Sequence, residues 1–299
     1  MAKRAVLAAG AIERPIVFGG NDRPGITMAA AVRTYANRFA AAVGREVLVF
    51  TNNNDGWRTA RDLRANGITV AALVDARSAV PDAVAADFDG RVLPGATLIG
   101  TKGGCGVRAA LVQTTRGRQT IACDAIAVSG GWNPNIGLAC HHGSRPKWEE
   151  EIAAFVPDSA PKGMTVVGAA NGAMTLAACV REGGVAGRSL AEALGFKVAS
   201  DALPTAHDED FAVRPFWHVT DSIQKAFVDF QNDVTAKDMM LAAREGFHSV
   251  EHLKRYTTLG MATDQGRTAN VVGLAMMAAL TGRSIPATGT TTYRPPYAP

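Results

Sequence analysis

Apolar positions along the chain fall into short continuous runs and into stripes with helical spacing. Residues 5–10, 46–51 and 70–75 are apolar runs typical of strands that are buried on both faces. Residues 52–66 lie between the last two runs and predict a loop followed by a helix, and residues 25–42 carry apolar side chains at helical spacing. A strand, a helix and a second strand in this order form a βαβ unit, which predicts an α/β fold with a parallel sheet.

The middle of the chain predicts a small antiparallel layer. Residues 91–99 and 107–113 have strand patterns, and the glycine-rich stretch 100–106 lies between them. We interpret these glycines as a hairpin turn, because no strand-then-helix context of a phosphate-binding loop surrounds them. Residues 120–130 predict one further strand.

A strand, a glycine turn and a helix then follow one another at residues 164–168, 169–172 and 173–182. The amide groups of a helix N-terminus point outward and attract anions. This arrangement therefore predicts a site for an anion or for the ribityl chain of a cofactor.

Composition narrows the class of protein. The 299 residues suffice for about two domains at roughly 150 residues each. The net charge of +4 comes without a lysine or arginine cluster, which argues against nucleic acid as a partner. The apolar runs 71–74 and 271–280 are shorter than the roughly 20 residues of a membrane span, so we expect no membrane partner. Four cysteines without a pattern (Cys105, Cys123, Cys140 and Cys179) favour a cytoplasmic location.

Asp75 ends the second strand of the βαβ unit, where dinucleotide folds place an acid that binds a ribose hydroxyl. The preceding turn from Thr51 to Gly56 holds one glycine where the fingerprint requires three. Two interpretations therefore stay open. Asp75 contacts the ribose of a nicotinamide dinucleotide, or it caps a turn of its own chain.

Three stretches carry a resemblance to a known class. Residues 6–15, 127–135 and 166–172 resemble, in this order, the two crossing strands and the late glycine–aspartate motif of two-dinucleotide-binding flavoproteins. In those proteins a nicotinamide-binding domain is inserted into a flavin-binding domain. The order and spacing of the three stretches favour the same arrangement here.

The C-terminal quarter resembles a narrower family. Residues 225–238, 244–257, 260–267 and 292–297 closely resemble the alpha subunits of heterotetrameric sarcosine oxidases. The related opine oxidase and hydrogen cyanide synthase subunits usually keep four cysteines in this region, whereas no cysteine follows Cys179 here. Iron–sulfur clusters need thiolate ligands, so the resemblance implies a ferredoxin-like domain without a cluster.

The resemblance implies an α/β chain with an incomplete two-dinucleotide-binding flavoprotein-type fold, followed by a small helical ferredoxin-like domain without cysteines. It assigns residues 1–44 to part of the outer dinucleotide-binding domain, residues 45–123 to an inserted nicotinamide-type βαβ domain, and residues 124–200 to the return to the outer domain. Residues 201–224 are then a linker, and residues 225–299 are the cysteine-less small domain with the C-terminal tail. The family starts with a glycine-rich βαβ unit and continues into an aminomethyltransferase domain. We expect the chain to be a fragment that lacks both.

The activity implied by the family is oxidation of sarcosine to glycine, with hydrogen peroxide and with formaldehyde or methylene-tetrahydrofolate as products. The resemblance implies NAD in the alpha subunit, FMN at the interface with the beta subunit and FAD in the beta subunit, with gamma and delta subunits as further partners. We expect no catalytic residue in these 299 residues, whose role is dinucleotide binding and docking to the beta subunit. The alternative is a non-catalytic assembly module or a decaying fragment without a cofactor. A generic nicotinamide-dependent reductase is a weaker hypothesis, because no redox cysteine pair is present.

Small residues with free backbone amides are the candidates for cofactor contacts, together with the acid at the strand end. The predicted cofactor-binding residues are Gly10, Ala11, Ile12, Asp75, Gly168, Ala169, Asn171 and Gly172. Ala169 stands where the family of flavoproteins has aspartate, and Asn171 is the candidate substitute. The competing interpretation is that these glycines only form tight strand-to-helix turns.

Other chemically active residues have simpler interpretations. His141 and His142 are adjacent and point in different directions, and His248 and His252 fit an exposed helix face, so we expect no metal site. Asp229 and Asp264 begin loops and are expected to cap turns rather than bind a hard metal ion. Four residues suit a partner surface or the phosphate of an interfacial flavin: Arg255, Tyr256, Arg267 and Arg294.

Overall fold

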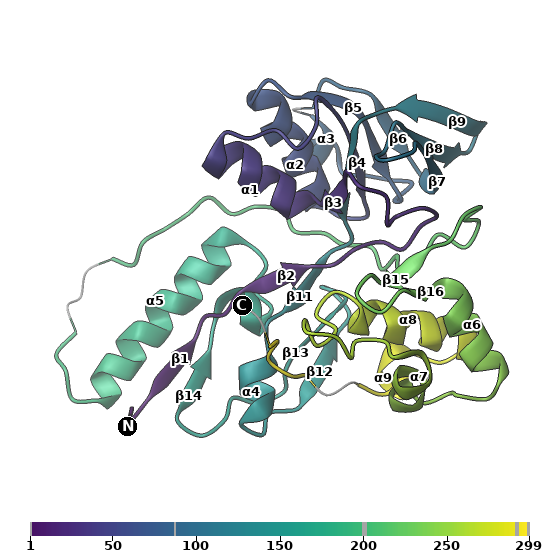
Figure 1. Cartoon of the computed structure of the whole chain (residues 1–299). Coiled ribbons are helices and arrows are strands. Elements are labelled where there is room, and N and C mark those ends of the chain that lie inside the picture. The colour runs from purple at the N-terminus through teal and green to yellow at the C-terminus, as the bar shows by residue number, and fades with distance from the viewer. Residues whose placement is uncertain (1, 87, 199–201, 291–292, 298–299) are drawn as a thin grey trace.

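Three bodies meet at one junction in the computed structural model, which describes residues 2–86, 88–198, 202–290 and 293–297 (Figure 1). An α/β domain lies at the top of the view, a strand-and-helix layer carries the N-terminus, and a helical domain contains most of the C-terminal part. The α/β fold class is confirmed.

The α/β domain is built on a five-stranded parallel sheet. Its strands in spatial order are β3 (Ile26–Met28), β10 (Ala125–Ser129), β4 (Glu46–Thr51), β5 (Thr69–Asp75) and β6 (Val92–Pro94). Side chains alternate between the two faces, because successive residues of a strand point to opposite sides. Val47 and Val49 pack with helices α1 (Ala29–Phe39), α2 (Asn54–Ala65) and α3 (Asp82–Ala85), whereas Leu48 and Phe50 pack with the antiparallel layer of β7 (Thr97–Lys102), β8 (Ala109–Thr114) and β9 (Gly117–Ala122).

Three details of the predicted elements are wrong. Residues 26–28 form a strand rather than the start of the helix, because they pair in parallel with β10. The stretch 91–99 is divided by a turn at Gly95, which has φ +64°, into β6 of the parallel sheet and β7 of the antiparallel layer. The stretch 120–130 is divided at Asp124, whose carboxylate accepts hydrogen bonds from the backbone of Arg45 and Glu46 at 2.9 Å. Strand pairing with distant segments, which local spacing does not encode, decides all three.

The predicted domain boundaries stay a prediction. The sheet of the inserted domain includes β3 and β10, which lie outside residues 45–123. The boundary between residues 200 and 201 falls outside the described residues.

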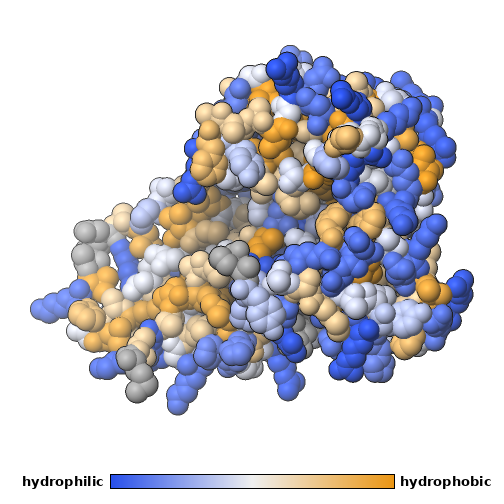
Figure 2. All heavy atoms as spheres, viewed as in Figure 1, coloured by the Kyte–Doolittle hydropathy of each residue, from blue (hydrophilic) through white to orange (hydrophobic). Residues whose placement is uncertain are grey.

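The N-terminal layer is small. Strands β1 (Ala5–Leu7) and β14 (Met164–Val166) pair in parallel, and β12 (Pro146–Glu149) and β13 (Ala154–Pro157) form a hairpin. Helices α4 (Gly137–His141) and α5 (Leu176–Ala193) complete it, with a short 3₁₀ helix, η1 (Gly168–Asn171), after β14. Figure 2 shows apolar side chains on the surface formed by α5, where Leu176 and Val185 are more than half exposed.

The helical domain has its own apolar core. A β-hairpin of β15 (Phe227–Asp229) and β16 (Val234–Thr235) leads into α6 (Ala236–Arg244), α7 (Val250–Thr257), α8 (Asn270–Thr281) and α9 (Ile285–Thr288). Thr235 and Asp238 form a reciprocal capping box that fixes the start of α6. The core collects apolar side chains from the hairpin and from three of the helices, among them Val228, Met239, Leu253 and Met277.

The bodies are joined by two crossing strands and by one buried arginine. Strand β2 (Ala11–Glu13) pairs antiparallel with β11 (Trp132–Pro134). The next residue, Arg14, is 0% exposed and donates hydrogen bonds to the carbonyl oxygens of Gly130 (2.8 Å), Trp132 (3.1 Å) and Ala153 (2.8 Å) and to Asn133 Oδ1 (3.1 Å), while its guanidinium lies 4.5 Å from the ring centre of Trp217. Burial lowers the pKa of Arg14 to about 9. One side chain therefore ties four distant segments together.

Glu13, beside it, reaches into the inserted domain. Its Oε2 accepts a hydrogen bond of 2.7 Å from the backbone amide of Ala30, in the first turn of α1. Burial raises the pKa of Glu13 to about 8, although hydrogen bonds from Ser129 and Ala30 oppose the shift. The carboxyl group is thus mostly protonated at neutral pH in the folded chain.

We expect Arg14→Lys to destabilise the fold by about 2–4 kcal/mol, because one ammonium group cannot reach the four acceptors of the guanidinium. Chemical denaturation of the full chain measures the change. Arg145→Lys is the control, since Arg145 is exposed and its substitution should stay within about 0.5 kcal/mol. Equal effects of the two substitutions would contradict the central role of Arg14.

Glu13 also predicts a pH dependence of stability. Between pH 4.5 and about 8 the unfolded chain has lost this proton while the folded chain keeps it, so stability falls as pH rises through this range, by up to about 1.4 kcal/mol per pH unit. Glu13→Gln should remove this contribution, and its advantage over the wild type should grow with pH and level off above about 8. Unfolding curves at several pH values measure it, with exposed Glu150→Gln as the control. A constant difference across the range would refute the assignment.

Candidate functional site

The two predicted glycine turns lie side by side. In the parallel pair of β1 and β14, Leu7 is the register partner of Val166, so both strands end at the same edge and lead directly to Gly10 and Gly168. These glycines have φ of +70° and +67°, a conformation that L side chains rarely adopt. A Cβ atom on Gly10 would meet no atom within 4 Å, so the turn borders open space. The structure thus brings the residues around Gly10 and around Gly168 together at one strand edge.

The late turn differs in detail from the prediction. Helix α5 begins at Leu176 rather than at residue 173, and Thr175 caps it by accepting a hydrogen bond from the amide of Ala178. The amide of Gly168 donates to Glu182 Oε2 at 2.8 Å. Its hydrogen bond is therefore already made to a carboxylate of the chain itself. Ala169 and Gly172 are half-buried, and Asn171 is exposed. An anion at this edge would therefore bind beside Gly168 and not on its amide.

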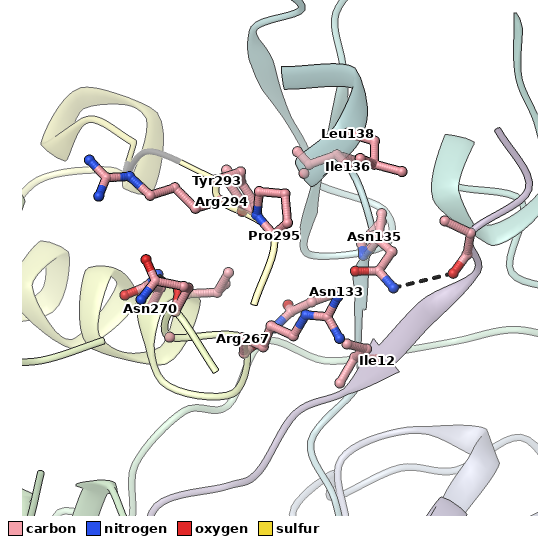
Figure 3. A pocket seen from close by; sticks show the side chains of 16 residues that line it. Ile12, Asn133, Asn135, Ile136, Leu138, Arg267, Asn270, Tyr293, Arg294 and Pro295 are labelled. Carbon is pink, nitrogen blue, oxygen red and sulfur yellow. Dashed lines mark hydrogen bonds between the residues drawn. The ribbon is translucent and has the colours of Figure 1, made fainter. Parts of the chain in front are cut away.

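A cavity of about 110 Å³ lies where the crossing strands meet the helical domain (Figure 3). The predicted residue Ile12 lines it together with Asn133 and Asn135 of the second crossing segment. Asn135 is held in place because its amide donates to Gly10 O at 2.9 Å and its Nδ2 to Ala9 O at 3.2 Å, the dashed line in Figure 3. Asn135 therefore links the wall of the cavity to the Gly10 turn by direct hydrogen bonds.

The opposite wall comes from the start of α8 and from the C-terminal tail. Arg267 and Arg294, both predicted to suit a phosphate or a partner, line the cavity with Asn270 and Tyr293. Asn133 Nδ2 donates to Arg267 O at 3.4 Å, which links the two walls. Burial raises the pKa of Tyr293, so this phenol stays protonated. Arg267 extends toward Ile12, whereas the guanidinium of Arg294 points away from the cavity toward the helical domain (Figure 3). One cation, the amide side chains of the wall and a neutral phenol suit a polar, phosphate-bearing ligand.

Four cavity residues were not predicted to have a role. Asn133, Asn135 and Tyr293 lie in stretches that carry the resemblance (127–135 and 292–297), but no pattern assigns them a function. Asn270 carries no sequence signal, because only the folded chain places it at the cavity. Arg255 and Tyr256 do not line the cavity, and Tyr256 stacks on Phe247 with ring centres 4.6 Å apart.

Asp75 is buried in its own domain. Its carboxylate accepts hydrogen bonds from Trp57 Nε1 at 2.7 Å, from the Arg77 amide at 2.9 Å and from the Arg77 guanidinium at 2.8 Å. Asp75 therefore caps a turn, and its contact with a ribose stays a prediction that would require these partners to move.

The remaining candidates have structural roles. Asp229 accepts hydrogen bonds from the amides of Gln231 and Gly260 and so joins two loops of the helical domain, and Asp264 accepts from the amide of Gly266. His248 precedes α7 rather than lying on it, which corrects the predicted helix face. Among the described residues, no group of three or more histidines, cysteines, aspartates or glutamates is placed to hold a metal ion.

Comparisons with known proteins agree with this geometry. The chain is 45% identical over 304 residues to sarcosine oxidase subunit alpha of Rhizobium meliloti (strain 1021), and 38% identical over 320 residues to the subunit of the same name from Corynebacterium sp. (strain P-1). Each match covers 100% of this chain but only 30% and 33% of the relative, so the chain spans about a third of their length. Residues 223–299 match the family model of the sarcosine oxidase A3 domain.

Solved structures show the same fold. L-proline dehydrogenase from P. horikoshii matches 99% of this chain and 57% of its own, with a TM-score of 0.74 and 20% identity. Thioredoxin reductase from T. acidophilum matches 64% of this chain and 66% of its own, with a TM-score of 0.51 and 17% identity. The chain therefore shares the fold of these two proteins.

The whole chain matches sarcosine oxidase alpha subunits, which confirms the resemblance predicted from the tail motifs. No helix in the described ranges is both long enough and apolar enough to cross a membrane.

Proposed function

We propose that this chain acts as part of the alpha subunit of a sarcosine oxidase complex, which converts sarcosine to glycine with hydrogen peroxide and with formaldehyde or methylene-tetrahydrofolate. The observation that carries the proposal is the match of the whole chain to alpha subunits at up to 45% identity. In this assignment the chain binds NAD and docks to a flavin-bearing beta subunit, with gamma and delta subunits as further partners in a cytoplasmic complex.

The dinucleotide is assigned to the shared edge of β1 and β14. Gly10, Ala11 and Ile12 form one side of this edge, and Gly168, Ala169, Asn171 and Gly172 form the other. The open space beside Gly10 supports close approach of a ligand to the backbone. Asn135, which is fixed to Ala9 and Gly10, supplies a polar side chain at the same place.

The cavity wall with Arg267 is assigned to the phosphate of an FMN shared with the beta subunit. The FAD of the complex belongs to the beta subunit, where the oxidation takes place. The chain's own residues then position and hold cofactors and contribute no acid or base to the oxidation. The alternative, a non-catalytic assembly module without a cofactor, predicts partner binding without nucleotide binding.

Gly10→Ala tests the dinucleotide site. Gly67→Ala is the matched control, because Gly67 also has a positive φ, +75°, and open space around its Cβ position, but lies at the end of α2. Both substitutions should destabilise the fold by a similar amount, about 1 kcal/mol. Only Gly10→Ala should weaken NAD binding, by at least about tenfold, in calorimetric titration with and without the beta subunit. Undetectable NAD binding to the wild type in both states would favour the assembly module.

Arg267→Ala tests the interfacial site. It removes a guanidinium from the cavity wall, so we expect less flavin in the complex co-purified with the beta subunit, measured from its visible absorbance. Arg283→Ala is the control, because Arg283 is exposed beyond the end of α8 and does not line the cavity. Unchanged flavin content in Arg267→Ala would reject the FMN assignment.

A further inference from the structure

The carboxyl edge of a parallel sheet is where doubly wound folds bind a dinucleotide. In this sheet β4 lies at the centre, with β5 and β6 on one side and β10 and β3 on the other. The polar residues along this edge are at most 8% exposed: Asn52, Asn53, Asn54, Asp75, Arg77 and Ser129. Something within the chain covers them.

The side chain of Asn53 occupies the position at which the phosphate of a dinucleotide would lie. Laid on the turn after β4, the three glycine positions of the dinucleotide fingerprint fall on Thr51, Asn53 and Gly56. Gly56 keeps the helix-packing role, because a Cβ atom there would lie 2.3 Å from Thr51 Cβ. At the second position, where the backbone must approach a pyrophosphate, Asn53 Oδ1 accepts from the Asp55 amide at 2.9 Å and Nδ2 donates to Ser129 O at 3.0 Å. The N-terminus of α2 is thus capped by the chain itself.

The connector between α5 and the helical domain closes the crevice from outside. Its Ala212 O accepts a hydrogen bond from the Asn54 amide at 3.1 Å, and its Arg214 amide donates to Asn52 O at 3.0 Å. Asn52 Nδ2 donates to Arg214 O at 2.7 Å, and Asn54 Nδ2 to Asp210 O at 3.0 Å. These bonds use backbone groups of the connector, as a peptide ligand does when it pairs along a strand.

Charge supports the same placement. The connector is acidic at residues 208–210, and Glu209 pairs with Arg58 of α2 at 2.6 Å. Arg77, which in a nucleotide site would stand beside the ribose, binds Asp75 and Asn54 and donates to Ala212 O at 3.5 Å. Carboxylates and carbonyls of the chain therefore meet the donors that phosphates would otherwise meet.

We propose that residues 208–214 are an internal ligand of the inserted domain, bound in its crevice in place of a dinucleotide. Binding the connector fixes the path of the chain from α5 to the helical domain, and Asp75 serves this arrangement by holding Arg77. The inference does not rest on the proposed function, which concerns the edge of β1 and β14.

Hydrogen–deuterium exchange of the full chain tests the proposal on peptides covering residues 50–58 and 206–216. Arg214→Pro removes the amide that donates to Asn52 O, and it should accelerate exchange in both peptides at least about tenfold. Thr205→Pro, in the same connector but outside the crevice contacts, should leave both unchanged. Asn52→Ala removes the side-chain donor to Arg214 O and the acceptor of Asn53 Nδ2 but keeps the backbone bond to the Arg214 amide. It should give a smaller increase in the same peptides and serves if Arg214→Pro does not fold.

Saturating NAD or ADP should leave both peptides of the wild type unchanged, whatever happens at the Gly10 turn. The proposal is overturned if either nucleotide slows exchange in 50–58 while releasing 206–216, because the crevice would then be a nucleotide site under a lid. It is also overturned if the wild-type peptides already exchange as fast as those of Arg214→Pro. If the chain binds no NAD at any site, the proposed function fails. The exchange results for residues 50–58 and 206–216 would still decide whether the connector is an internal ligand.

Discussion

The burial of one guanidinium group, that of Arg14, is the constraint on which the arrangement of the three bodies depends. A buried cation is tolerated only where hydrogen bonds replace the water it has lost. Arg14 obtains them from the end of β10, from β11 and from the start of β13, and it stacks on Trp217 of the connector. The partners lie in three segments, residues 130–133, Ala153 and Trp217, so the positions of these segments are fixed relative to one another.

The two carboxyl edges of the molecule have opposite characters. At the edge of β1 and β14, Gly10 borders open space and a cavity opens beside Ile12. At the edge of the inserted sheet, polar side chains are satisfied by one another and by the connector. The molecule therefore presents one accessible strand edge and one that is filled, and the difference arises from a few side chains such as Asn53.

The sequence predicts the parts of this structure that depend on local pattern. Strands 46–51 and 70–75 are found almost to the residue, because strands buried on both faces are continuous apolar runs. Residues 26–28 are mispredicted as helix because their spacing continues into α1, and only pairing with β10 makes them a strand. That β1 and β14 place Gly10 beside Gly168 depends on parallel pairing across about 160 residues, which no local pattern encodes. The cavity could not be predicted, since Ile12, Asn135 and Arg267 become neighbours through the crossing strands and through the packing of α8. The only sequence signal for the closed crevice is that the turn from Thr51 to Gly56 lacks two of the three glycines of the dinucleotide fingerprint.

The hydrogen bonds of Arg14 span 116 to 139 residues of sequence. At ribosomal rates of about 5–20 residues per second, its acceptors are synthesised roughly 6 to 28 seconds after Arg14 itself. During that interval β1 and β2 lack the strands with which they pair in the described structure, β14 and β11. Assembly of the junction is thus a late event in the synthesis of this stretch of chain.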